Sequence, residues 1–295
     1  MVHQAADALA RLSLNTATVQ RLSLSEALQV ARRAGLHHVG LWRDRVTEVG
    51  LARAVQLVAQ SGLTVSSLCR GGFLTAADPA GIRDALADNR AAIAEAEALG
   101  TSELILVVGG LPPGDRDLVA ARERVAARVG ELAGFAESHG VRLVLEPLHP
   151  MYAGDRAVLS TLGQALDLAA PHDPAVVGVV VDTFHVWWDP ALAEQVARAG
   201  RERRLASYQV CDFNLPIAAD PLLSRGMMGD GVIDFAAITR MVAATGYHGP
   251  VEVEIFNADI WAAPADGVVE TMTERWRTLV LPWLSPQPTR AAAAS

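Results

Sequence analysis

Short apolar segments alternate with longer amphipathic segments along this chain of 295 residues. Uncharged runs rich in β-branched residues are typical of strands buried on both faces, and the longer segments carry the caps and closing glycines of helices. The predicted strands cover residues 12–15, 38–42, 63–69, 103–108, 142–146, 176–181, 205–211 and 251–255. The predicted helices follow them at residues 23–34, 49–60, 79–99, 115–138, 161–169, 191–199, 234–245 and 267–281.

Eight strand–helix units in strict alternation predict the fold class. The main alternative is a doubly wound sheet, whose first loop usually carries a glycine-rich phosphate turn. The loop at residues 15–18, Asn-Thr-Ala-Thr, has no glycine. We therefore expect a single-domain (β/α)8 TIM barrel over residues 1–284, followed by a flexible tail at 285–295 that is rich in proline and alanine.

Composition limits the partners and the compartment. The net charge of −8 and the lack of clustered Lys and Arg argue against a nucleic-acid partner. No apolar run approaches the roughly 18 residues that a membrane span needs, so no membrane partner is expected. Cys69 and Cys211 are too few for a disulfide framework and lack CxxC spacing, which favours a cytoplasmic location.

Four predicted strands end in a side chain that can bind a hard divalent cation, namely Glu146, Asp182, Gln209 and Glu254. In a barrel that closes in sequence order, these side chains are neighbours around one half of its C-terminal mouth. Three carboxylates with no Lys or Arg beside them would repel one another, which favours a bound cation. Oxygen ligands suit Mn²⁺, our first choice, or Mg²⁺ or Co²⁺ better than zinc. Glu252 shares a face with Glu254 and is interpreted as a deeper, hydrogen-bonded core carboxylate.

Four motifs together resemble a known family. They are Leu145-Glu146-Pro147, Asp182-Thr183-Phe184-His185, the loop from Arg225 to Gly229-Asp230-Gly231, and residues 246–256. The chain resembles the sugar phosphate isomerase/epimerase superfamily over roughly residues 12–280, the xylose isomerase-like barrels that include ketose 3-epimerases and inosose dehydratases. The resemblance implies that Glu146, Asp182 and Glu254 are metal ligands. It also implies that Glu146 and Glu254 are catalytic acid/base carboxylates on opposite faces of the substrate.

One position departs from the epimerase pattern. Those enzymes usually place a metal-binding His three residues before an Asp, where this chain has Gln209 before Asp212. A Glu-Asp-Gln-Glu set resembles the 3-dehydroshikimate dehydratase branch instead, which weakens the case for simple epimerisation. The alternative role for Gln209 is a hydrogen-bonded amide in the barrel core.

Polar residues in the exit loops are candidates for substrate contact. His149 and His185 each fall three residues after a predicted ligand, and we expect substrate contact or proton transfer from them, with His149 as a catalytic candidate. The resemblance places Arg225 in a loop that covers the site, where it would hold a substrate oxygen or carboxylate. Arg70 is a second cation for the same task.

Several aromatic residues also lie near the ends of predicted strands. Trp42 and Trp187, with Phe73, Trp188 and Trp261, could form an apolar wall for a ring-shaped substrate. The alternative for each is ordinary packing over the barrel mouth.

Three classes of function stay open. The leading hypothesis is a divalent-metal-dependent isomerase or epimerase of a sugar, keto-sugar or cyclitol, which removes the proton α to a metal-bound carbonyl to give an enediolate. A lyase on the same scaffold would instead dehydrate a cyclic keto-polyol or cleave a keto-glycoside by β-elimination, and Gln209 and His149 favour it. The third class is an endonuclease-like or a non-catalytic sugar-binding barrel, which the acidic charge and the Glu146–Glu254 pair disfavour. Barrels of this family are often dimers or tetramers, so a homo-oligomer is among the expected states.

Overall fold

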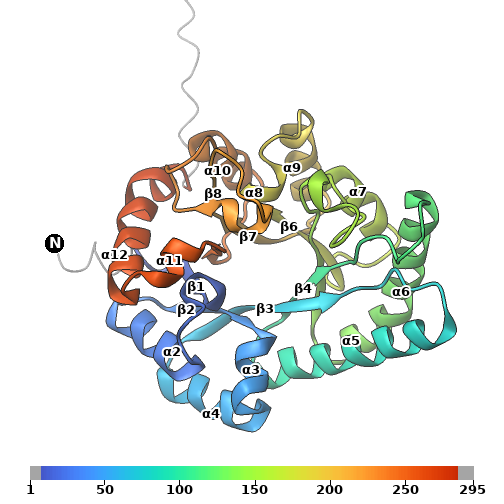
Figure 1. Cartoon of the computed structure of the whole chain (residues 1–295), viewed down its shortest axis with the longest axis horizontal. Coiled ribbons are helices and arrows are strands. Elements are labelled where there is room, and N and C mark those ends of the chain that lie inside the picture. Colours follow the sequence, from blue (N-terminus) through green and yellow to red (C-terminus); the bar gives the residue numbers. More distant parts are fainter. Residues whose placement is uncertain (1–7, 285–295) are drawn as a thin grey trace, which may run out of the picture.

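Eight parallel strands close into a barrel in the computed structural model, which describes residues 8–284 (Figure 1). Neighbouring strands are hydrogen-bonded in the order β1-β10-β7-β6-β5-β4-β3-β2. They are β1 (Leu12–Asn15), β2 (His38–Trp42), β3 (Thr64–Gly72), β4 (Glu103–Val107), β5 (Arg142–Leu145), β6 (Val177–Asp182), β7 (Leu205–Val210) and β10 (Val251–Val253). The closed parallel barrel confirms the predicted TIM-barrel fold. The tail expected at 285–295 lies outside the described residues.

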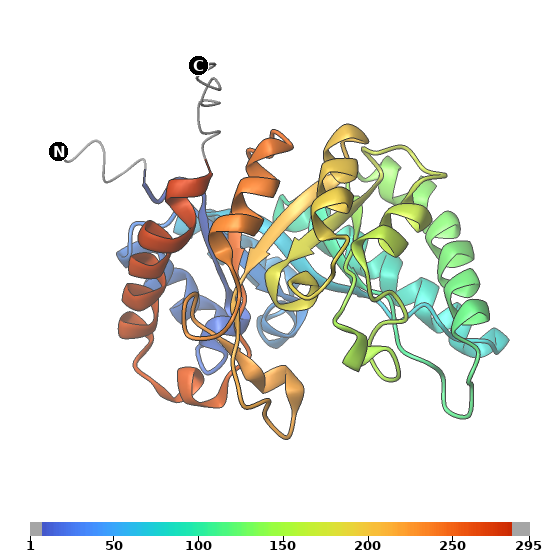
Figure 2. The same cartoon turned by 90° about the horizontal axis from the view of Figure 1, so that it is seen from above.

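The helices form a ring outside the barrel (Figure 1), and the long segments that follow β5 and β7 project on the same side of the molecule (Figure 2). Within residues 8–284, no helix combines the length and apolar character needed to cross a membrane. The helices are α2 (Leu24–Arg33), α3 (Arg43–Val49), α4 (Leu51–Ser61), α5 (Pro79–Leu99), α6 (Leu118–Ser138), α7 (Leu162–Ala169), α8 (Thr183–Val186), α9 (Leu192–Arg201), α10 (Phe235–Ala244), α11 (Ala258–Ala262) and α12 (Ala265–Arg275), with short 3₁₀ turns at Thr16–Val19, Pro150–Tyr152, Pro221–Ser224 and Leu281–Trp283 and a π-helical turn at Trp276–Val280.

One buried stripe attaches α6 to the barrel. Its buried residues recur at intervals of three or four positions, which is the period of one helix face. They are Ala121, Val125, Val129, Leu132 and Ala136. Side-chain capping sets where helices begin. Asp78, the residue before α5, accepts hydrogen bonds from the backbone N–H groups of Ala80 and Gly81.

Two segments differ from the sequence prediction for local backbone reasons. The helix expected at 49–60 is α4, and a further helix, α3, precedes it, with Gly50 at a φ of 78° between the two. The strand expected to end at Cys69 continues to Gly72, so Arg70 lies within β3 rather than in an exit loop. The extension is held by Asn89, whose amide bonds both the N–H and the C=O of Gly72 at 2.7 and 2.8 Å.

Glu252 is a structural carboxylate inside the barrel, as its position in the sequence predicted. It accepts hydrogen bonds from the Asn15 amide at 2.7 Å and from the hydroxyls of Ser66 and Ser67 at 2.5 and 3.0 Å. A Cβ atom at Gly40 would lie 2.3 Å from the Glu252 carboxyl carbon. The glycine therefore makes the room that this buried carboxylate needs.

A cavity of about 300 Å³ opens at the N-terminal ends of the strands, far from the strand-end carboxylates. Glu103 lines it, and one of its carboxylate oxygens is buried without a hydrogen-bond partner among the described residues. Burial raises the pKa of Glu103 to about 7, against the opposing effect of Arg142 beside it. Ionising this side chain therefore costs folding free energy.

The raised pKa of Glu103 predicts a pH-dependent stability. A folded-state pKa above the unfolded value means that stability is highest at acidic pH and falls as the pH rises from about 4.5 to 7. Glu103→Gln should flatten this loss, raising the free energy of unfolding at pH 8 by up to about 3 kcal/mol relative to its effect at pH 4. Urea unfolding across this range measures it, with exposed Glu194→Gln as the control. Parallel pH profiles for wild type and Glu103→Gln would refute the assignment.

Candidate metal and catalytic site

The four side chains predicted to bind a metal lie on neighbouring strands at one edge of the barrel. Asp182 ends β6, Gln209 lies in β7, and Glu146 and Glu254 directly follow β5 and β10. These four strands are consecutive neighbours in the barrel, and Asp182 pairs in register with Gln209. All four side chains are at most 3% exposed.

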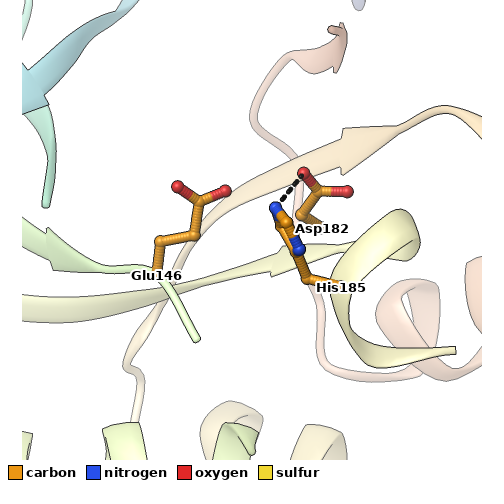
Figure 3. Close-up of side chains that lie close together, drawn as sticks. All are labelled: Glu146, Asp182 and His185. Carbon is orange, nitrogen blue, oxygen red and sulfur yellow. Dashed lines mark ion pairs between the residues drawn. The ribbon is translucent and has the colours of Figure 1, made fainter. Parts of the chain in front are cut away.

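His185 joins this group from the short helix α8. One ligand atom each from Glu146, Asp182 and His185 lies within 4.8 Å of the others (Figure 3). His185 Nδ1 accepts the backbone N–H of His149 at 3.1 Å, and its Nε2 lies 2.9 Å from Arg225 Nη2. Burial and the positive charge of Arg225 hold the pKa of His185 well below its usual value. His185 is therefore held as a neutral imidazole whose two ring nitrogens face the His149 backbone N–H and Arg225.

Arg225 corrects the expectation that the carboxylates have no cation beside them. Its guanidinium lies 3.0 Å from Asp182 Oδ2 and 3.2 Å from Glu254 Oε2, and it is 3% exposed. The same nitrogen donates to the Glu254 backbone carbonyl at 3.2 Å. Arg225 therefore offsets part of the negative charge and holds two of the carboxylates in place.

A small hairpin absent from the sequence prediction positions Arg225. Strand β9 (Arg225–Gly226) pairs antiparallel with β8 (Asp212–Phe213) directly after β7. The Asp212 carboxylate accepts the backbone N–H groups of Phe213, Gly229 and Ile233 at 2.8–3.0 Å. Asp212 thus fixes the segment that returns across the barrel mouth.

Glu146 and Glu254, called the two outer carboxylates below because β5 and β10 are the outer two of the four strands, lie in environments that disfavour their charged form. Burial, followed by the negative charges of Glu254 and Asp182, raises the pKa of Glu146 well above its usual value. Burial also raises the pKa of Glu254 to about 7, with Arg225 opposing the rise. Carboxyl groups tuned toward neutrality suit proton transfer near neutral pH.

The donor atoms fit a divalent cation. Glu146 Oε1 and both amide atoms of Gln209 are buried and have no hydrogen-bond partner within residues 8–284. Burying such groups unpaired is costly, so their convergence indicates a missing partner. Three carboxyl groups, one amide oxygen and one imidazole suit a divalent metal, and a bound cation would favour the ionised carboxylates that burial alone disfavours.

A cavity of about 130 Å³ opens beside these groups. Its lining includes both outer carboxylates and four of the predicted substrate contacts, Trp42, Arg70, His185 and Arg225. Trp42 also donates its indole N–H to Glu254 Oε1 at 2.8 Å, which ties the predicted aromatic wall to a candidate catalytic carboxylate.

Two sequence-predicted contacts lie elsewhere. The rings of His149 and Trp187 do not belong to the cavity lining and pack on Phe213, with ring centroids 5.7 and 5.3 Å away. His149 Nδ1 accepts the Met151 backbone N–H at 3.3 Å, because the Pro150–Tyr152 turn folds the loop back on itself. His149 therefore contacts the site through its backbone N–H to His185, and a catalytic role for its imidazole stays a prediction.

The structure also brings in residues that sequence reasoning missed. Arg156, Leu222 and Phe256 line the cavity. Arg156 lies in the long segment after β5, and its only sequence signal is a cation in a loop that follows a ligand-bearing strand.

A family model for the xylose isomerase-like TIM barrel matches residues 28–279. The chain belongs to this family. The crystal structure of protein SMc04130 from Sinorhizobium meliloti 1021 is 46% identical, with a TM-score of 0.89 over 92% of this chain and 98% of that one. The family assignment thus agrees with the resemblance seen in the sequence motifs.

Two curated relatives carry enzyme names. A 3-dehydroshikimate dehydratase from Pseudomonas aeruginosa is 31% identical over 57% of this chain and 25% of its own length. An inosose isomerase from Halalkalibacterium halodurans is 22% identical over 68% of this chain and 69% of its own length. The chain thus spans about a quarter of the dehydratase it matches. Both relatives are enzymes by name.

Removing the buried cation tests the charge balance of the site. Arg225→Met keeps much of the side-chain volume but leaves Asp182 and Glu254 unpaired, so we expect it to lower the free energy of unfolding of metal-free protein by about 3–5 kcal/mol. Chemical denaturation in a chelator measures the loss, with exposed Arg53→Met as the control. A loss no larger than that of the control would contradict the pairing.

Proposed function

We propose that this protein is a divalent-metal-dependent isomerase or epimerase of a small sugar, keto-sugar or cyclitol. The supporting observation is that Glu146 and Glu254 line one cavity beside buried ligand atoms that lack partners. Paired carboxylates at the C-terminal mouth of a barrel can remove and return a proton on a bound substrate. The relative named inosose isomerase supports a cyclitol or sugar as the substrate class.

Glu146, Asp182, Gln209 and Glu254 would hold the metal, with His185 as a further donor. When bound, the ion would stabilise negative charge that develops on the substrate oxygen. Oxygen-rich ligation keeps Mn²⁺ as the predicted metal, ahead of Mg²⁺ or Co²⁺. The two cysteines are free and buried, in keeping with the predicted cytoplasmic location.

Proton transfer falls to Glu146 and Glu254. They follow β5 and β10, which β6 and β7 separate in the barrel, so a ring bound between them would present a different face to each. One carboxylate takes the proton from the carbon next to the carbonyl, and the other returns a proton to the opposite face, which inverts that carbon. Return to the neighbouring carbon instead gives an aldose–ketose isomer.

The surrounding residues orient these carboxylates and keep water out. Trp42 bonds one Glu254 oxygen at 2.8 Å and Arg225 bonds the other at 3.2 Å, so the carboxylate cannot rotate freely. Phe256 packs edge-on against Trp42 with ring centroids 5.3 Å apart, which makes one wall of the cavity apolar.

A lyase acting on a cyclic keto-polyol is the second candidate. Gln209 takes the place of the His usual in epimerases, and the Pseudomonas aeruginosa relative is named 3-dehydroshikimate dehydratase. The first step, removal of the proton α to the carbonyl, is the same in both reactions. Expulsion of a β-substituent would then replace return of the proton.

Deuterium exchange tests the proton transfer itself. We expect the protein with Mn²⁺ in D₂O to place deuterium α to the carbonyl of at least one member of a panel of keto-sugars and keto-cyclitols, detected by mass spectrometry. Chelation should abolish the exchange, and Mn²⁺ should restore it. Deuterated substrate or epimer supports the isomerase, and loss of water or an aglycone supports the lyase.

Matched variants identify the acid/base groups. Glu146→Gln and Glu254→Gln should each lower the exchange rate by orders of magnitude without unfolding the protein, because the amide cannot accept the proton. Exposed Glu274→Gln is the control and should retain the wild-type rate. Full activity after chelation, or near-wild-type exchange in both variants, would refute the proposal.

A further inference from the structure

The cavity beside the carboxylates is lined by both acidic and basic side chains. Glu146 and Glu254 are the acidic ones, and Arg225 is already paired with Asp182 and Glu254. Two other lining residues, Arg70 and Arg156, carry positive charge that none of these carboxylates pairs with.

Arg70 presents a guanidinium whose donors are free. Its central carbon lies 4.1 Å from the centre of the Phe73 ring and 5.9 Å from that of Trp42. Within residues 8–284, its side chain makes no ion pair and no hydrogen bond. Stacking covers a face of the guanidinium but leaves the N–H groups at its edge available. Phe73 itself is 43% exposed, which is consistent with a rim position.

Arg156 reaches the same cavity from the segment after β5. Its side chain is 38% exposed, although its Nε is buried and makes no hydrogen bond among the described residues. That Nε lies 3.7 Å from the carboxylate of Asp155, which is 67% exposed. Burial and the positive charge of Arg156 both lower the pKa of Arg70, so the two side chains interact electrostatically. Two guanidinium groups that line one cavity repel each other, and a bound anion would offset that repulsion.

We propose that Arg70 and Arg156 form a carboxylate-binding subsite, so that the substrate is a small polyhydroxylated ring that carries a carboxylate. This inference rests on the proposed function, because it takes the cavity as the substrate pocket. The carbonyl end of the ring lies at Glu146 and Glu254, and the carboxylate lies between the two arginines. The planar fork of a guanidinium matches the two oxygens of a carboxylate. A cavity of about 130 Å³ favours a single ring over a longer glycoside.

Binding measurements with paired ligands test the subsite without relying on turnover. Ligand-observed NMR titration of the full chain with Mg²⁺ compares D-glucuronate with D-glucuronamide, and shikimate with its primary amide. Each pair differs in charge but hardly in shape. We expect at least one carboxylate to bind about tenfold or more tightly than its amide. Equal affinities within both pairs, or no saturable binding of either carboxylate, would overturn the proposal.

Variants assign the preference to the two arginines. Arg70→Gln with Arg156→Gln should reduce the carboxylate preference to within about twofold, whereas the exposed pair Arg53→Gln with Arg83→Gln should keep it. Arg70→Lys with Arg156→Lys retains the charge and should keep part of the preference, which covers the case in which the first pair folds poorly. An unchanged preference in both arginine-site pairs would refute the assignment. If D-glucose 6-phosphate bound more tightly than D-glucuronate, and this binding depended on the two arginines, the subsite would be a phosphate site and the carboxylate proposal would be wrong.

The two proposals can fail separately. Arginine-dependent binding of carboxylates without any metal-dependent deuterium exchange would support the subsite and contradict the proposed reaction. Metal-dependent deuterium exchange on neutral keto-sugars, without any preference for carboxylates, would support the proposed reaction and contradict the subsite.

Discussion

The burial of three carboxylates at one edge of the barrel is the constraint on which the site depends. Asp182, Glu146 and Glu254 are almost fully excluded from water, where a lone negative charge is very costly. Arg225 pairs with two of them, and Glu146 keeps an oxygen without a partner. Arg225 offsets part of the cost of ionising these carboxyl groups, and a bound divalent cation would offset the rest.

The same constraint explains how the barrel divides its polar groups. Glu252 lies only two residues before Glu254, yet its oxygens are saturated by Asn15 and two serines, so it has no capacity left for a ligand. Glu254 sits at the open end of the strand, where its partners are Trp42 and Arg225 and the cavity begins. The number of hydrogen bonds that each carboxylate accepts therefore distinguishes the structural Glu252 from Glu254, which faces the cavity.

Much of the fold could be predicted from the sequence, and so could the meeting of four polar side chains at one edge of the barrel. Uncharged runs indicated buried parallel strands, and the polar residues at their ends, Glu146, Asp182, Gln209 and Glu254, lie on neighbouring strands as expected. The place of Arg225 among them could not be predicted, because the hairpin that carries it has strands of two residues and no periodic pattern. Local turns likewise send the rings of His149 and Trp187 toward Phe213.

The central claim is that these strand-end side chains form one divalent-metal site. Anomalous diffraction from crystals soaked in Mn²⁺ tests this most directly. The account predicts a single strong peak about 2 Å from oxygen atoms of Glu146, Asp182, Gln209 and Glu254. No peak there, or a peak confined to the cavity around Glu103 at the opposite end of the barrel, would contradict it.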